Sequence, residues 1–403
     1  MAEKSLNDYI GRVNALRVPT RILPAIVFSQ FAGTSLWFAG NAILGQLQEA
    51  WNLPGEAIAS VTTAVMLGFI VGTFVFALFS VADRFSTTRV FFVCATLGAL
   101  ANVLVTLLAP SYTLLLVCRF VTGFFIAGIY PVGMKIASDW FAGKLGKALG
   151  YLVGALVVGT AFPHLLKYLG AGLSWTFVLT GTSALAFLGG LTMLFFVGEG
   201  PHRKPGARFD PAKIVSVFKE KDFRAAAFGY FGHMWELYTF WAFLPAILTY
   251  YDSTHTGHID PSLWTFIIIA LGSLACIFGG IFSLKHGSGK VAFAFLTISG
   301  VLCLFSPLFY DLAPVFFLGI LIIWGMAVIG DSAQFSSLNA QTAPKEFVGT
   351  ALTIAVSIGF ALTIPSIQLL GYLSTVIDTP WLLFTLAIGP AFGLFFSRRL
   401  IGK

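Results

Sequence analysis

Apolar segments of about 20 residues follow one another along almost the whole chain, and they constrain its fold more than any other feature. A helix of that length crosses the ~30 Å hydrocarbon layer of a membrane. The segments leave no stretch long enough for a sizeable soluble domain. We therefore predict an all-α membrane protein with twelve transmembrane helices, at residues 22–46, 57–80, 89–108, 112–137, 147–168, 175–197, 223–251, 261–283, 290–309, 312–337, 347–369 and 380–397.

The lysine and arginine residues lie almost entirely on one side of this predicted topology. If both ends of the chain face the cytoplasm, 22 of the 24 Lys and Arg residues fall on the cytoplasmic side. Short loops rich in these residues stay on that side of a membrane. We expect a multi-pass protein of the plasma or inner membrane with cytoplasmic N- and C-termini. The two exceptions are Arg119, inside the fourth span, and Lys167, at the outer end of the fifth.

The longest loop divides the chain into two sets of six spans. It is polar, and it contains three prolines and six Lys or Arg residues. Two six-helix halves around a site at mid-membrane suit alternating access. The predicted parts are a cytoplasmic N-terminal segment 1–21, a bundle 22–197, a cytoplasmic linker 198–222, a second bundle 223–397 and a cytoplasmic tail 398–403.

Two motifs give the chain a resemblance to a known family. Asp83 and Arg84, followed by Arg89, are similar to the loop motif between the second and third helices of the major facilitator superfamily (MFS), although its usual glycines are absent. Arg119 followed by Gly123 resembles the fourth-helix motif of the same family. The resemblance covers essentially the whole chain and implies two pseudo-symmetric six-helix bundles. It also implies that the first, fourth, seventh and tenth helices line a central cavity.

Arg119 is the first candidate for substrate binding. It lies about 12 Å below the outer edge of the fourth span, where an ionised group costs several kcal/mol. One interpretation is a fixed cation in a water-filled cavity that binds an anionic substrate group or a proton-carrying carboxylate. The alternative is a structural tie to backbone carbonyls or a neighbouring helix. Tyr130, eleven residues further on, shares the same helix face and is a second candidate.

The seventh span contains the richest set of polar residues. Tyr230, His233 and Glu236 are spaced by three and form one stripe, and Tyr238 flanks it. A buried carboxyl group beside a histidine is typical of proton carriers in membranes. We predict that Glu236 and His233 couple transport to protons and that Tyr230, His233 and Tyr238 bind substrate. The alternative is a buried Glu236 paired permanently with His233 or Arg119.

The first span has a polar stripe of its own, formed by Gln30, Trp37 and Asn41 at helical spacing. Only a face turned away from lipid tolerates such a stripe. We therefore predict that these three residues line the cavity and bind substrate.

Charged residues at the cytoplasmic ends of the helices are candidates for gating. We predict that Asp83, Arg84 and Arg89 form an inner gate between the halves, a contact that a rocking mechanism makes and breaks. The alternative is that the arginines only set topology, which leaves Asp83 unexplained. Asp331 is placed near the cytoplasmic end of the tenth span and is interpreted as a gate or helix-end contact.

Other polar groups receive weaker interpretations. His164 beside Lys167 either adds to a positive funnel or bonds to a neighbouring helix. His255 and His258 occupy one outer loop, for which a solvated loop is favoured over a metal site. No phosphate-binding loop is present, so no nucleotide cofactor is implied. We expect no metal, no cofactor, no nucleic-acid partner and no enzyme activity.

We predict a secondary active transporter that moves a small organic solute, carrying an anionic group, by proton-coupled symport. Sodium remains open as the coupling ion. One alternative is a proton-coupled exporter of amphipathic compounds, and another is a membrane ligand sensor that transports nothing. The expected partners are the solute, the proton and the lipid bilayer, and the expected state is a monomer.

Overall fold

The computed structural model describes residues 18–107, 110–141, 145–203, 214–344 and 348–402. Within these residues the chain is helical and contains no strand, as predicted. Most of the predicted N-terminal segment, the middle of the predicted linker (204–213) and the last residue of the tail lie outside the described residues.

The helices divide into those before and those after the linker. The first set comprises α2 (Ile22–Thr34), α3 (Ala39–Trp51), α4 (Ala57–Leu78), α5 (Val81–Arg84), α6 (Thr87–Leu104), α7 (Tyr112–Ile126), α8 (Tyr130–Trp140), α9 (Leu145–Leu169), α10 (Thr176–Thr192) and the π turn η2 (Met193–Val197). The second set comprises α11 (Ile214–Val217), α12 (Lys221–Thr254), α13 (Pro261–His286), α14 (Ser288–Phe305), η4 (Ser306–Asp311), α15 (Pro314–Gly330), α16 (Ser332–Thr342), α17 (Val348–Leu373), α18 (Thr379–Leu382), η5 (Leu383–Ala387), α19 (Ile388–Ser397) and η6 (Arg398–Leu400).

The predicted twelve crossings are confirmed. Eleven helical segments among the described residues are long and apolar enough to span a membrane. The twelfth is α12, whose 34 residues are more than the roughly 20 that a membrane-spanning helix needs. Its tyrosine, tryptophan, histidine and glutamate side chains make it less apolar than the others, which is consistent with a helix buried inside the protein.

Three of the crossings are broken in the middle. Residues 35–38 separate α2 from α3, residues 127–129 separate α7 from α8, and Asp331 separates α15 from α16. A break leaves backbone carbonyls without their partners in the helix, and these must be satisfied inside the protein because lipid offers none. Arg119 meets the first of these breaks, and Asp331 forms the third.

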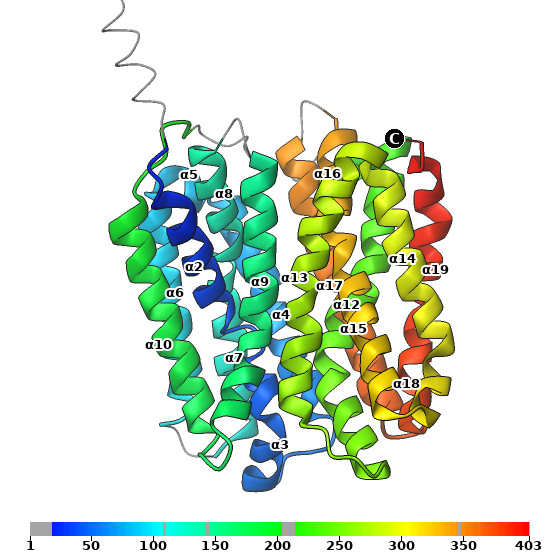
Figure 1. Cartoon of the computed structure of the whole chain (residues 1–403). Coiled ribbons are helices and arrows are strands. Elements are labelled where there is room, and N and C mark those ends of the chain that lie inside the picture. Colours follow the sequence, from blue (N-terminus) through cyan, green and yellow to red (C-terminus); the bar gives the residue numbers. More distant parts are fainter. Residues whose placement is uncertain (1–17, 108–109, 142–144, 204–213, 345–347, 403) are drawn as a thin grey trace, which may run out of the picture.

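The two sets of helices form two halves that lie side by side, as Figure 1 shows. They meet along two seams, where α4 packs on α17 and α9 packs on α13. The start of α2 and the end of the chain lie at the same end of the molecule (Figure 1). We call this the inner end, because the charge pattern predicts that it faces the cytoplasm, and we call the opposite end the outer end.

Small residues allow the helices of the first half to approach closely. A Cβ atom on Gly68 or Gly72 would overlap the backbone of α7, and one on Gly123 would overlap the backbone of Val65 in α4. The packing of α4 on α7 fixes the helix that carries Arg119 within the bundle. The glycines are thus needed for contact between helices rather than for a turn.

Candidate functional site

Arg119 closes the break in the first span. Its Nη2 donates to the carbonyl oxygens of Leu36, at 3.0 Å, and Trp37, and its Nη1 donates to Asn102 Oδ1 at 2.9 Å. The side chain is 1% exposed. The amide of Asn102 in turn bonds to the carbonyl of Leu179 and to Thr182 in α10. In this structure the guanidinium therefore bonds to backbone carbonyls and to a neighbouring helix, the arrangement that the structural alternative describes.

The other polar residues of the first span are also packed inside the first half. Asn41 donates from Nδ2 to Thr62 Oγ1 at 2.6 Å. Gln30 lies against Gly133 of α8, and neither polar atom of its amide has a hydrogen-bond partner within the described residues. A buried amide without a partner costs free energy, so Gln30 remains a candidate for binding something the structure does not contain.

Glu236 lies inside the second half, between α12, α14 and α15. Its Oε1 accepts hydrogen bonds from Ser299 Oγ at 2.5 Å, Trp324 Nε1 at 2.7 Å and Cys303 Sγ at 3.3 Å. Its Oε2 is buried and has no partner among the residues described. These three hydrogen bonds thus come from neutral donors and not from His233 or Arg119, the two partners that the structural alternative predicted for Glu236.

His233, one turn before Glu236, pairs with Asp331 instead. Its Nδ1 lies 2.8 Å from Asp331 Oδ1, and both side chains are 1% exposed. The placement of Asp331 near the cytoplasmic end was wrong. The tenth span continues through α16 to Thr342, which puts Asp331 eleven residues before its end, at the break between α15 and α16. Helix α12 therefore presents two titratable groups to the interior of the second half, and Asp331 lies within electrostatic range of Glu236.

A cluster of aromatic rings joins the two halves at their centre. We call it the central aromatic cluster, and it consists of Trp37, Phe38 and Phe69 from the first half with Tyr238, Trp241 and Phe360 from the second. The Trp37 ring stacks on Tyr238 at 5.6 Å and on Phe360 at 5.8 Å, measured between centroids. All six side chains are buried. Trp37 and Tyr238, predicted from separate spans, are thus brought together.

Two further predicted tyrosines lie near the cluster. Tyr130 begins α8 in the first half and is partly exposed, and it interacts electrostatically with Tyr230 and Tyr238 of α12. Tyr230 also packs against the ring of His233, with 5.9 Å between centroids. Tyr230 thus connects this region to the buried His233–Asp331 pair.

Of the predicted gate residues at the inner end, Asp83 contacts its own half. Asp83 forms an ion pair with Lys135 of α8 at 2.7 Å. Arg203, at the start of the linker, bonds to Glu199 at 2.8 Å and donates to the backbone carbonyl of Asp83. Arg84 and Arg89 are exposed. The loop between the second and third spans is thus tied to the linker, and the role of these residues in gating stays a prediction.

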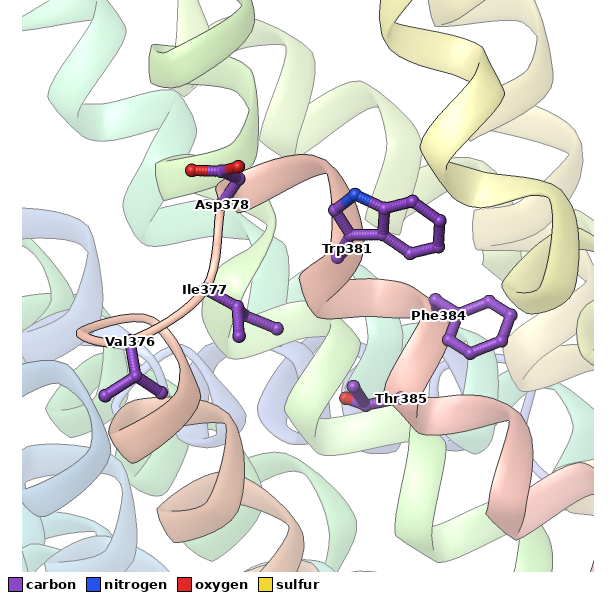
Figure 2. A pocket seen from close by; sticks show the side chains of 6 residues that line it. All are labelled: Val376, Ile377, Asp378, Trp381, Phe384 and Thr385. Atoms are coloured by element: carbon purple, nitrogen blue, oxygen red, sulfur yellow. The ribbon is translucent and has the colours of Figure 1, made fainter.

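A wide hollow of about 520 Å³ lies at the outer end, away from these groups. Figure 2 shows it between the end of α17 and the turn that follows α18, with Asp378, Trp381 and Phe384 around it. The nearby outer loop between α12 and α13 contains His255, stacked on Tyr251, and His258, which is 96% exposed. Among the described residues no group of three or more His, Cys, Asp or Glu side chains is arranged to hold a metal ion.

Several residues of these sites were not predicted from the sequence. Asn102, Ser299 and Cys303 are small side chains within apolar helices, where such residues usually serve packing. Trp324 was noted only as a residue of the tenth span. Asn102 could have been recognised from the sequence, because it is a strongly polar residue in an otherwise apolar segment of the third span.

Comparison with known proteins identifies the family. The family described as the Major Facilitator Superfamily matches residues 26–366. No curated protein matches the chain. Among solved structures the chain is similar to a mutant of the nucleoside transporter NupG, with a TM-score of 0.71 and 13% identity, covering 94% of this chain and 99% of that one. It is also similar to a bacterial homologue of the human lysosomal transporter Spinster in an inward-facing, unoccupied conformation, with a TM-score of 0.66 and 15% identity, covering 95% of this chain and 93% of that one.

At these identities the two structures establish the fold alone, whereas the family match covers most of the chain. The predicted family and the predicted absence of enzyme activity are both confirmed. The chain belongs to the Major Facilitator Superfamily, and it is a membrane transporter rather than an enzyme.

Proposed function

We propose that this transporter moves a small organic solute by alternating access and that the proton gradient drives its accumulation. The observation that carries the proposal is the buried Glu236, bonded by three neutral donors within the second half. An ionised carboxylate without a cationic partner is costly in such surroundings, so a group placed there is suited to taking up and releasing a proton. His233, one turn before Glu236 on α12, pairs with Asp331 at the break between α15 and α16, and this pair offers a second place for a proton.

For the solute, the central aromatic cluster and the three tyrosines are the proposed binding groups. They belong to both halves, which a site used by alternating access requires. The expected preference for an anionic solute depended on Arg119, whose two terminal nitrogens are engaged by three oxygen acceptors. We therefore propose that recognition depends on ring surfaces and hydroxyl groups, and that an anionic group is not required.

The same observation favours a second candidate function, the proton-coupled export of amphipathic compounds. Stacked tryptophan, tyrosine and phenylalanine rings bind flat or apolar solutes, and they attract organic cations through their faces. Export and uptake use the same parts of the molecule and differ in the direction of net movement. The two candidates are therefore separated by transport measurements rather than by further geometry.

A ligand screen followed by a transport assay tests the proposal. Thermal unfolding of the purified protein is measured with benzoate, a nucleoside and tetraphenylphosphonium, each at about pH 5.5 and pH 7.5. A ligand at 100 times its Kd stabilises by about 2.7 kcal/mol, which such an assay detects. The solute that binds is then followed into proteoliposomes under an imposed proton gradient, with a sodium gradient as the parallel arm.

In that assay we expect Glu236→Gln to lose at least about tenfold of gradient-driven accumulation while exchange of solute across the membrane persists. Asp311→Asn, which alters an exposed acid in η4, is the matched control and should behave as the wild type. Full accumulation by Glu236→Gln would show that Glu236 is not the coupling group. Accumulation driven by a sodium gradient alone would mean that sodium, and not the proton, is the coupling ion.

The location and state of the protein are also proposals. The charge bias supports a plasma or inner membrane protein with cytoplasmic termini. We further propose that it works as a monomer, because each molecule has both halves of the site. Labelling of a cysteine placed in the tail from one side of intact cells tests the orientation.

A further inference from the structure

Lys167, the cation that breaks the charge rule at the outer end, lies at the seam between the halves. It is in the last turn of α9, the helix that packs on α13 of the other half, and Figure 1 shows the two helices side by side. The side chain lines a hollow of about 160 Å³ together with Gln46 of α3 and with Asp260 and Ser262 of the other half. The hollow thus has walls from both halves.

Two acids attract the ammonium group of Lys167, and only one of them lies across the seam. Asp260 precedes α13 and caps it, with Oδ1 accepting from the backbone N–H of Leu263 at 2.8 Å. Glu49 belongs to α3, in the same half as Lys167. Both acids interact electrostatically with Lys167. The attraction to Asp260 therefore draws the halves together, whereas the attraction to Glu49 does not.

Below Lys167, the same helix buries two polar side chains that are not satisfied. His164 and Thr160 are 1% and 0% exposed, and neither ring nitrogen of His164 nor the hydroxyl of Thr160 has a hydrogen-bond partner in the described part of the chain. His164 lies two turns beyond Val157, which packs on Gly272 of α13, so the two share the face of α9 that meets the other half. Buried polar groups without partners disfavour the packed state.

We propose that Lys167 and Asp260 form an outer gate, and that Thr160 and His164 line the passage which this gate opens. In the closed arrangement the charge attraction across the seam offsets the cost of the unpartnered groups. When the outer end opens, the two charges separate and water reaches the histidine and the hydroxyl. The gate is thus balanced, because one part of α9 favours the closed arrangement and another favours the open one.

The other seam provides a second outer contact of a different kind. Gln368 Nε2 of α17 donates to Thr63 Oγ1 of α4 at 2.7 Å, and a Cβ atom on Gly371 would lie 2.5 Å from the Cβ of Ala59. This seam is held by a neutral hydrogen bond and close packing, and the α9–α13 seam by charge. Added salt should therefore weaken the α9–α13 seam more than the α4–α17 seam.

The test directly measures the distance between the outer ends of the two halves. Spin labels are attached to Ser174→Cys, in the loop after α9, and to Thr256→Cys, in the loop before α13, both at exposed positions. Pulsed electron resonance then gives the populations with short and long separations in the purified full-length protein. The inference rests on the proposed alternating access, but the readout requires neither solute nor proton gradient. Failure of the coupling assay would therefore leave this result standing.

We expect Lys167→Met and Asp260→Asn each to raise the long-distance population by about two- to fivefold, the range for an attraction between partly solvated opposite charges. The matched control is Glu49→Gln, which removes an equivalent charge within one half and should not raise it. His164→Leu should lower the long-distance population by about fivefold or more, because it removes the unpartnered groups from the closed arrangement.

Unchanged populations in Lys167→Met, or an equal rise in Glu49→Gln, would overturn the gate. A rise in His164→Leu would mean that the histidine is bonded in the closed arrangement, and would overturn the proposed passage. If either single variant does not fold, the exchanged pair Lys167→Asp with Asp260→Lys should return the wild-type populations, because it keeps the attraction across the seam, and His164→Met should lower the long-distance population as His164→Leu does.

Discussion

Each half of the transporter has a cluster around a buried charged side chain, Arg119 in the first half and Glu236 in the second, but the two side chains are held in different ways. Arg119 lies on the fourth span and joins the third span to the break in the first. Glu236 lies on the seventh span and contacts the ninth and the tenth. The seventh, ninth and tenth spans of the second half correspond in order to the first, third and fourth of the first half. The cation is bound mainly by backbone carbonyls, whereas the acid is bound by side-chain donors.

This difference distinguishes a charge with a structural role, that of Arg119, from a group that can gain and lose a proton, Glu236. Carbonyl oxygens can only accept, so the carbonyl partners of Arg119 suit a group that keeps its charge at all times. A hydroxyl group can donate or accept, and Glu236 has one oxygen without a partner in the described residues, so the acid can change its protonation state. The comparison predicts that the first cluster supports the fold and that the second supports coupling.

The largest effect should come from Arg119→Leu. The substitution leaves the carbonyls of Leu36 and Trp37 and the amide oxygen of Asn102 without their donor, which we expect to cost about 3 kcal/mol or more of folding stability. Thermal unfolding and the yield of monodisperse protein in detergent measure it, with Arg119→Lys as an intermediate. A stable Arg119→Leu protein that loses only the transport of anions would show that Arg119 binds substrate, and would contradict its structural role.

A smaller effect is expected when the acid is removed. In Glu236→Leu the donors Ser299 and Trp324 lose their acceptor, and we expect a loss of about 2 kcal/mol. Glu236→Gln keeps an acceptor at that place and should lie within about 1 kcal/mol of the wild type. Chemical or thermal unfolding of the two variants side by side measures the difference. Equal losses would show that the charge itself, rather than the hydrogen bonds, stabilises the second half.

Coupling energies between pairs of residues test the comparison of the two clusters further. A double-mutant cycle of His233→Gln with Asp331→Asn should give a coupling energy of about 1–2 kcal/mol, because the two side chains are in contact. The cycle of Arg119→Lys with Glu236→Gln should be additive within about 0.5 kcal/mol, since the two clusters share no hydrogen-bond partner among those described. A large coupling in the second cycle would mean that the two halves communicate through these charges.

The smallest effects should come from the ion pairs at the inner end. Lys135→Met breaks the pair with Asp83 in the first half, and Arg399→Met breaks the pair with Asp222 in the second. Both pairs are partly exposed, so each should contribute at most about 1 kcal/mol. We expect Lys135→Met alone to change the transport rate, because its partner Asp83 belongs to the segment between the second and third spans that is also tied to the linker. Equal rates for the two variants would remove the loop from the gating proposal.

The sequence was sufficient for the all-helical fold and for the membrane-spanning helices. Periodicity and charge determine these features, and both are local properties of the chain. It was not sufficient for the partners. The carbonyls that bind Arg119 become available only because the first span breaks at residues 35–38, which contain neither glycine nor proline. Asp331 was misplaced because the tenth span continues past its own break.

The tie between Arg119 and the first span also has a consequence for synthesis in the membrane. The guanidinium and the carbonyl of Leu36 are separated by 83 residues along the chain. The first span is therefore made well before the residue that completes it, and until then its open carbonyls need water or another polar partner. Insertion of this half cannot finish one helix at a time, because its first helix becomes stable in lipid only when the fourth has arrived.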